Sequence, residues 1–98
     1  MLTKAQKKQL KALANTLDIK YQIGKNEVSA TLLDMLDKAL TAHELIKIDV
    51  MKSVDDDIED LSSKLSTSLK AEIVQTIGRT IILFRRNPQK NKIQLIKR

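Results

Sequence analysis

The 98-residue chain contains no cysteine and no tryptophan, and it has only one proline, two glycines, one tyrosine and one phenylalanine. Without cysteine it can form neither a disulfide nor a cysteine-based zinc site. The longest uninterrupted apolar run, residues 81–84, is far shorter than the roughly 18–20 residues that a membrane-spanning helix needs. The chain also does not open with the residue series of a secretory signal. We therefore expect a cytoplasmic protein with no membrane partner.

Residue groups for catalysis or metal binding are also missing. The single histidine, His43, has no set of further ligands and no nucleophile to activate. The acidic residues between positions 55 and 60 lack the glycine and the spacing of an EF-hand loop. No phosphate-binding P-loop and no hydrolase elbow is present. These absences predict a protein that is not an enzyme and that has no cofactor.

Charge is distributed unevenly along the chain, whose net charge is +6. Residues 1–25 carry six lysines and one acid, and residues 73–98 carry seven lysines and arginines and no acid. Residues 26–72 between them carry eleven acids and five lysines. A basic surface made by the two ends of the chain, with the acidic middle turned elsewhere, favours a polyanion as partner.

Hydrophobic spacing predicts three helices. A capping box that begins at Thr3, followed by apolar residues at positions 10, 13, 14 and 17, predicts a first helix near residues 3–15. Ser29 as N-cap and leucines at 32, 33, 36 and 40 predict a second helix that ends near residue 42. Ser53 as N-cap and apolar residues at 54, 58, 61, 65 and 69 predict a third.

Residues 19–23 and 46–50 alternate between apolar and polar, which predicts two strands, each with one buried face. Two further β-rich runs, 73–77 and 80–85, flank Gly78-Arg79 and predict a hairpin. Strands joined by helices are expected to be parallel, and the last strand returns antiparallel. The order α-βαβαββ predicts an α/β two-layer sandwich with a four-stranded mixed sheet. We expect one domain over residues 1–88 and a basic tail over 89–98 that can add a short edge strand.

Four blocks of sequence, together with this order of elements, resemble one known family. They are Leu-Thr at 2–3, Gln-Ile-Gly-Lys-Asn at 22–26, His-Glu-Leu-Ile-Lys-Ile at 43–48 and Val-Gln-Thr-Ile-Gly-Arg at 74–79. The blocks are similar to the bacterial YhbY-like proteins, which are stand-alone CRM domains (chloroplast RNA splicing and ribosome maturation). The resemblance covers residues 2 to about 88. It implies a fold like the C-terminal domain of translation initiation factor 3, RNA binding, and association with precursors of the large ribosomal subunit.

The chain departs from the family pattern at two positions. The family's Gly-x-x-Gly loop reads Gly24-Lys25-Asn26-Glu27 here, so a carboxylate lies near the expected phosphate path. Lys70 stands before the third strand, where the family often has glycine. A helix C-cap is less favourable without glycine, although a cation there complements the helix dipole.

Three groups of residues are candidates for contact with RNA phosphates. Four lysines of the first helix repeat at i, i+3, i+4 and i+7 and form one stripe without acidic neighbours at helical spacing. The glycine loop precedes helix amides that suit a phosphate oxygen, and arginine forks in the hairpin and after the last strand suit it bidentately. The predicted contacts are Lys4, Lys7, Lys8, Lys11, Gly24, Lys25, Asn26, Arg79, Arg85 and Arg86. The simpler alternative for each group is a solvated surface or an ordinary turn.

Aromatic residues indicate the mode of recognition. Tyr21 and Phe84 both fall in strand patterns that assign them to the core, so no exposed rings remain for stacking bases. We expect a monomeric protein that reads RNA mainly by charge and shape, with ribosomal RNA as the leading target and ribosomal proteins as further partners. The alternative is a protein-interaction module whose acidic third helix docks a basic partner.

Overall fold

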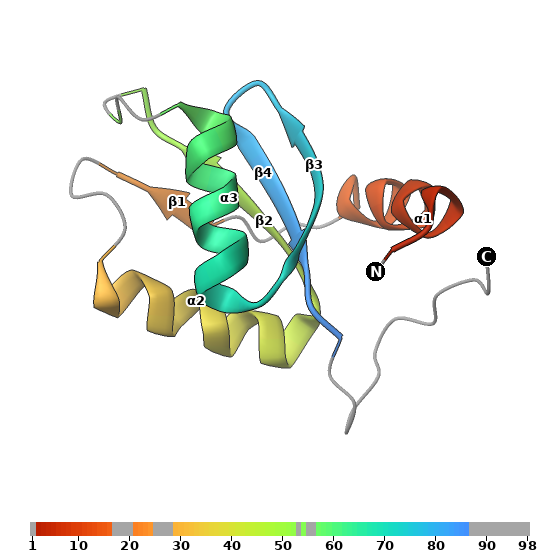
Figure 1. The fold of residues 1–98 in the computed structure, drawn as a ribbon, viewed down its shortest axis with the longest axis horizontal. Helices are drawn as coiled ribbons and strands as arrows, with labels where there is room; N and C mark the ends of the chain where they lie inside the picture. The colour runs from red at the N-terminus through yellow and green to blue at the C-terminus, as the bar shows by residue number, and fades with distance from the viewer. Residues whose placement is uncertain (1, 17–20, 25–28, 53, 55–56, 87–98) are drawn as a thin grey trace.

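The computed structural model describes residues 2–16, 21–24, 29–52, 54 and 57–86 (Figure 1). Its elements are α1 Lys4–Ala14, β1 Tyr21–Ile23, α2 Ala30–His43, β2 Leu45–Val50, α3 Ile58–Leu69, β3 Glu72–Ile77 and β4 Thr80–Phe84. The predicted order of elements is confirmed, and most ends agree within one or two residues. The predicted tail over 89–98 lies outside the described residues.

The four strands form one mixed sheet in the order β1-β2-β4-β3. β1 and β2 are parallel, whereas β4 is antiparallel to both β2 and β3. β1, β2 and β3 therefore run in one direction and β4 runs antiparallel to them, as predicted, and the structure places β4 between β2 and β3. All four residues from Ile81 to Phe84 are buried, which is typical of a central strand covered on both faces.

α2 and α3 cover the same face of the sheet and enclose the main core. Leu36 and Leu40 of α2 and Leu61 and Leu65 of α3 lie in one buried cluster with strand residues that include Ile48. Tyr21 is half-buried and packs against this cluster, in agreement with its predicted place in the core. This pair of layers is the predicted two-layer sandwich.

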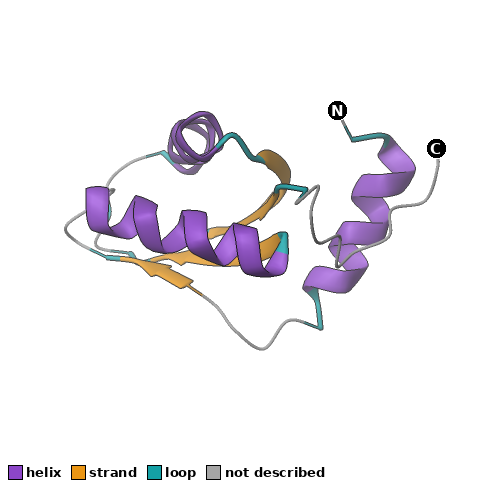
Figure 2. Ribbon diagram, turned by 90° about the horizontal axis from the view of Figure 1, so that it is seen from below, coloured by secondary structure: helices purple, strands orange, loops and turns teal. Residues whose placement is uncertain are grey.

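α1 packs on the opposite face of the sheet and makes a second, smaller core. Leu10 and Ala14 of α1 are buried with residues that alternate along the strands with those of the main core, namely Leu45, Val74, Ile82 and Phe84. Figure 2 shows α1 set apart from α2 and α3, at one end of the molecule. Leu13 was predicted on the apolar side of this helix but is 37% exposed, because only Leu10 and Ala14 face the sheet.

The helix starts confirm two of the three predicted caps. The Thr3 hydroxyl oxygen accepts the backbone N–H of Gln6 at 3.1 Å, and the Gln6 side chain accepts the Thr3 N–H in return. The Ser29 Oγ accepts the Leu32 N–H at 3.1 Å. The start predicted for the third helix is wrong, because α3 begins at Ile58 with Asp57 as its N-cap. Ser53 lies outside the described residues.

Val54 precedes α3 but is buried in the main core all the same. Its backbone N–H donates to the Met51 carbonyl at 3.0 Å, so this residue belongs to a turn between β2 and α3. An apolar residue at helical spacing can thus reach the core from the connection before the helix. This turn explains why the apolar spacing predicted too early a start.

Two backbone positions after helices have left-handed torsions. Lys70 ends α3 with φ 53° and ψ 43°, the conformation that glycine adopts with least strain. Glu44 follows α2 with φ 64°, is fully buried, and its carbonyl accepts the Arg85 N–H at 2.8 Å. In the predicted hairpin, Gly78 supplies a φ of 56° in the two-residue connection between β3 and β4.

Candidate nucleic-acid interface

The lysine stripe of α1 is present on the surface as predicted. Lys4 and Lys8 are exposed, whereas Lys7 and Lys11 are half-buried along the flank of the helix nearer the sheet. Neither the helix nor its first turn contains an acidic residue. None of the four ammonium groups forms an ion pair with a residue that the structure describes. Four uncompensated cations on one flank repel one another and attract an anion.

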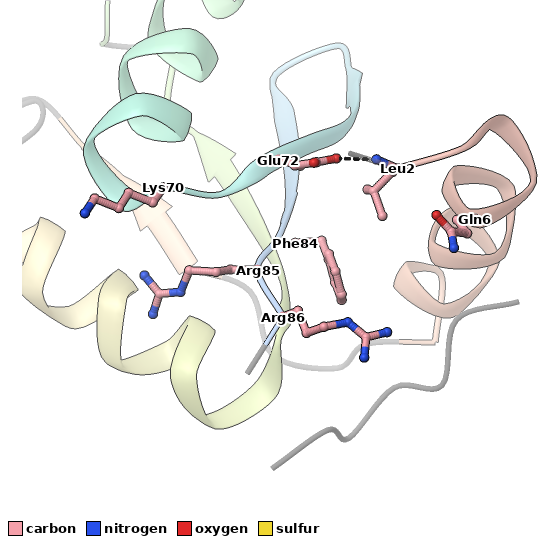
Figure 3. Close-up of a pocket in the computed structure, with 7 residues that line it drawn as sticks. All are labelled: Leu2, Gln6, Lys70, Glu72, Phe84, Arg85 and Arg86. Atoms are coloured by element: carbon pink, nitrogen blue, oxygen red, sulfur yellow. Dashed lines mark hydrogen bonds between the residues drawn. The ribbon is translucent and has the colours of Figure 1, made fainter. Parts of the chain in front are cut away.

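Arg86 is exposed and adds a fifth cation near the N-terminal end of α1. Figure 3 shows its guanidinium directed toward α1, while the neighbouring Arg85 points the opposite way. Arg86 and Gln6 of α1 line the same pocket. The tertiary structure thus brings the end of β4 close to the first helix, as the charge layout suggested.

Arg85 binds other parts of the protein. Its Nη1 donates to the Asp37 carboxylate at 2.6 Å and to the Leu69 carbonyl at 2.9 Å. Its Nη2 donates to the Asp37 carbonyl at 2.8 Å and to the Thr41 hydroxyl at 2.9 Å. All four terminal N–H donors thereby join β4 to α2 and to the end of α3. The side chain is only 21% exposed, so little of it can meet a phosphate.

Arg79 is engaged in a similar way at the hairpin. Its Nε donates to the Val50 carbonyl at 3.1 Å, and its Nη2 donates to the Met51 and Val54 carbonyls at 2.8 Å each. The guanidinium therefore binds the carbonyl at the end of β2 and two carbonyls of the turn that follows it. Its Nη1 group can still donate to a phosphate, but the other donors of Arg79 hold the turn after β2 against the hairpin.

The glycine loop is at the far end of the molecule from α1. In Figures 1 and 2 the end of β1 and the start of α2 lie at one end of the long axis, and α1 lies at the other. Gly24 does not have a left-handed φ, and a Cβ built there would lie 3.4 Å from the Met51 Sδ. Lys25 and Asn26 lie outside the described residues. The predicted contacts thus do not form one continuous patch.

α2 starts without an acidic residue in its first turn, whereas α3 starts with several. Asp57 caps α3, Glu59 and Asp60 occupy its first turn, and all three are exposed. Carboxylates there offset the helix dipole and repel phosphate. Anions are therefore favoured near α1 and at the start of α2, and disfavoured at the start of α3.

The described residues contain no group of three or more histidine, cysteine, aspartate or glutamate side chains that could hold a metal ion. No described helix is long and apolar enough to cross a membrane. His43 is the last residue of α2. Phe84 is 4% exposed and Tyr21 is half-buried, so neither ring forms an open stacking platform on the sheet.

Residues 2–85 match the CRS1/YhbY (CRM) domain family, and the chain belongs to this family. It is 35% identical over 95 residues to a Bacillus subtilis protein named "Probable RNA-binding protein YqeI", covering 97% of this chain and 99% of that protein. It is 34% identical to the Pseudomonas aeruginosa "Probable RNA-binding protein PA4753", covering 93% of this chain and 88% of that protein.

A solved structure has the same fold. The solution structure of SAV1595 from Staphylococcus aureus superposes with a TM-score of 0.80 at 35% identity. The match covers 98% of this chain and 100% of that protein. Family membership, which the four sequence blocks predicted, is thus confirmed.

Proposed function

We propose that this protein binds structured RNA through its phosphates and catalyses no reaction. The observation that carries the proposal is the lysine stripe of α1, defined by Lys4, Lys7, Lys8 and Lys11, whose charges have no described partner. Names of the Bacillus and Pseudomonas relatives support RNA as the polyanion. Arg86 extends the cationic surface from the end of β4, and the start of α2 offers a second, separate contact.

The proposed RNA is ribosomal, and the proposed setting is assembly of the large subunit in the cytoplasm. This part of the proposal is supported by the resemblance to YhbY-like proteins. Crosslinking in cells, followed by sequencing of the bound RNA, tests it directly. Reads concentrated on large-subunit RNA or its precursor are expected, and reads spread over messenger RNAs would contradict it.

Salt titration tests the proposed mode of recognition. Binding that releases counterions makes log affinity fall linearly with log salt concentration. Contact by about five cations predicts a slope of roughly −3.5 to −4.5. A folded RNA should bind more tightly than a scrambled RNA of equal length, because the protein has no exposed aromatic residues for reading single bases. A flat salt dependence with strong discrimination between bases would contradict this mechanism.

A second candidate function is docking of a basic protein on the acidic start of α3. The exposed carboxylates of Asp57, Glu59 and Asp60 favour it. Replacing all three with amides, Asp57→Asn, Glu59→Gln and Asp60→Asn, would weaken such docking and leave RNA binding intact or strengthened. If association with ribosomal particles survives Lys-to-Glu changes in α1 but is lost in this triple variant, the docking function is the better account.

A further inference from the structure

The C-terminal half of α1 is held against the sheet by apolar packing and by a hydrogen bond. Leu10 and Ala14, the two buried residues of the helix, both lie in this half and pack in the small core. The Lys47 ammonium of β2 donates to the Ala14 carbonyl at 3.1 Å, in a partly buried position. A cation at this place satisfies a carbonyl at the end of the helix and complements the helix dipole.

The N-terminal half of α1 has less apolar support. None of residues 4–9 is buried, and a cavity of about 450 Å³ lies between this part of the helix and the ends of β3 and β4 (Figure 3). Leu2, just before the helix, is half-buried against the small core. Three of the four lysines of the stripe, Lys4, Lys7 and Lys8, belong to this half. Most of the charge of the stripe therefore lies on the less firmly packed half of the helix.

A hydrogen bond beside this cavity joins the start of α1 to the sheet. The Glu72 carboxylate at the start of β3 accepts the Leu2 N–H at 2.9 Å, as the dashed line in Figure 3 shows. The bonds of Glu72 and Lys47 lie at opposite ends of an 11-residue helix, which is about 16 Å long. Attachment at both ends fixes the direction of the helix axis, whereas attachment at Lys47 alone lets the lysine-rich end swing.

We propose that Glu72 is a positioning residue for RNA binding, whose carboxylate holds the N-terminal half of α1 so that the lysines of the stripe meet phosphates together. The proposal rests on the RNA-binding function proposed above, and it gives an acidic residue a part in binding a polyanion. Charge alone predicts the opposite, because removing a carboxylate beside a cationic surface makes that surface attract RNA more strongly. The two accounts therefore differ in the sign of the effect on affinity.

Three variants of Glu72 with equal net charge separate these accounts. Glu72→Gln keeps an acceptor oxygen for the Leu2 N–H, whereas Glu72→Met removes it. Glu72→Thr also removes it, because the threonine hydroxyl is too short to reach, and threonine is favoured in strands. Circular dichroism first verifies that each variant folds.

Salt titrations with a hairpin RNA that has a fully paired stem measure the effect. Glu72→Gln should bind this RNA at least as tightly as the wild-type protein does. Glu72→Met and Glu72→Thr should bind it about fivefold more weakly at about 0.15 M salt, because one lysine fewer reaches a phosphate. The salt slope of these two variants should be shallower by about 1.

Residual dipolar couplings give a readout that a change in stability alone does not move, because they report the orientation of α1 relative to the sheet. The amide couplings of α1 should fall relative to those of β2 and β4 in Glu72→Met and keep their wild-type values in Glu72→Gln. Glu59→Met is the matched control, since it removes one carboxylate at the exposed start of α3. It should change neither the couplings of α1 nor the salt slope, and it should not weaken RNA binding.

Equal affinity and equal salt slope in Glu72→Gln and Glu72→Met would overturn the proposal and leave RNA binding standing, because these variants differ in the acceptor. A Glu72→Thr variant that binds like Glu72→Gln would overturn it as well. So would weaker binding by Glu72→Met with unchanged couplings in α1. Failure of the wild-type protein to bind the hairpin RNA would contradict the proposed function itself, and with it the part assigned to Glu72.

Discussion

Two sets of cations on this protein have opposite surroundings. The lysine stripe of α1 and Arg86 have no described ionic partner, and most of these side chains face solvent. Arg79 and Arg85 instead donate seven hydrogen bonds to main-chain and side-chain oxygens of the same chain. The sequence alone does not separate the two sets, because each of these lysines and arginines is a basic residue in one of the two basic segments at the ends of the chain.

This comparison shows that the role of a cationic side chain depends on which acceptor oxygens the fold places next to it. Helix ends and turns leave carbonyls without partners, and a guanidinium with several fixed donors can satisfy a group of them. Arg85 donates to the carbonyl of Leu69, the last residue of α3, and Arg79 donates to carbonyls at the end of β2 and in the connection that follows it. Among the described residues, none of the four α1 lysine ammonium groups donates a hydrogen bond or forms an ion pair, so their charge remains for a partner.

The largest effect that separates the two sets is expected for Arg85. Arg85→Met keeps an apolar stem and removes the donors to Asp37, Thr41 and the Leu69 carbonyl. The free energy of unfolding should fall by about 2 kcal/mol, because four charge-assisted hydrogen bonds are lost, of which only the one to the Leu69 carbonyl is partly buried. Urea unfolding measures this loss. The matched change Arg86→Met should stay within about 0.5 kcal/mol of wild type, and equal losses at the two positions would refute the distinction.

Arg79→Met should show a smaller loss of the same kind. The carbonyl at the end of β2 and two carbonyls in the connection after it would lose their donor, but Met51 is exposed and water can replace part of the interaction. We expect the free energy of unfolding to fall by about 1–2 kcal/mol. Hydrogen exchange should quicken first near Val50 and Val54. Unchanged stability and unchanged hydrogen exchange would mean that Arg79 does not stabilise the fold and is available to bind RNA.

Replacing Lys7, Lys8 and Lys11 with Gln should affect binding and spare folding. RNA affinity should drop about tenfold or more at moderate salt, and the salt slope should become shallower by about 2–3. The free energy of unfolding should change by less than about 1 kcal/mol, since none of the three lysines forms an ion pair with a described residue and glutamine keeps most of the aliphatic stem of the half-buried Lys7 and Lys11.

The control for the lysine variant is Lys38→Gln with Lys64→Gln, on α2 and α3. This double variant should reduce RNA affinity less, per positive charge removed, than the triple variant of α1 does. Lys38 already pairs with Asp34 at 3.2 Å, so it offers less free charge. If both variants lose affinity in proportion to charge alone, the stripe on α1 has no special role.

The smallest expected effect concerns Lys70, whose left-handed φ makes glycine the less strained residue. Lys70→Gly should raise the free energy of unfolding by about 0.5–1 kcal/mol, because relief of strain exceeds the added entropy of the unfolded chain. Thermal or urea unfolding measures the gain. Lys64→Gly, in the interior of α3, should lower it by about 1 kcal/mol, so a loss at both positions would disprove the strain.

The sequence alone was sufficient for the class of fold and for the family. Local signals are strong where side-chain spacing and capping act within a few residues, as in the Thr3 capping box and the Ser29 cap. The strands, the hairpin at Gly78 and the direction of each strand followed from similar short-range patterns. The prediction was wrong at the start of α3, because Val54 reaches the core from a turn rather than from a helix.

Only the tertiary structure decided that β4 lies between β2 and β3, and that α1 covers the opposite face of the sheet from α2 and α3. It also separated the predicted contacts into two groups at opposite ends of the molecule and gave Arg79 and Arg85 internal partners. The physical reason is the distance along the chain over which each interaction acts. Periodicity and capping depend on neighbours along the chain, whereas strand order and the oxygens around a guanidinium depend on residues 16 to 48 positions away. The sequence therefore determined which cations exist, and the fold determined which of them remain available to RNA.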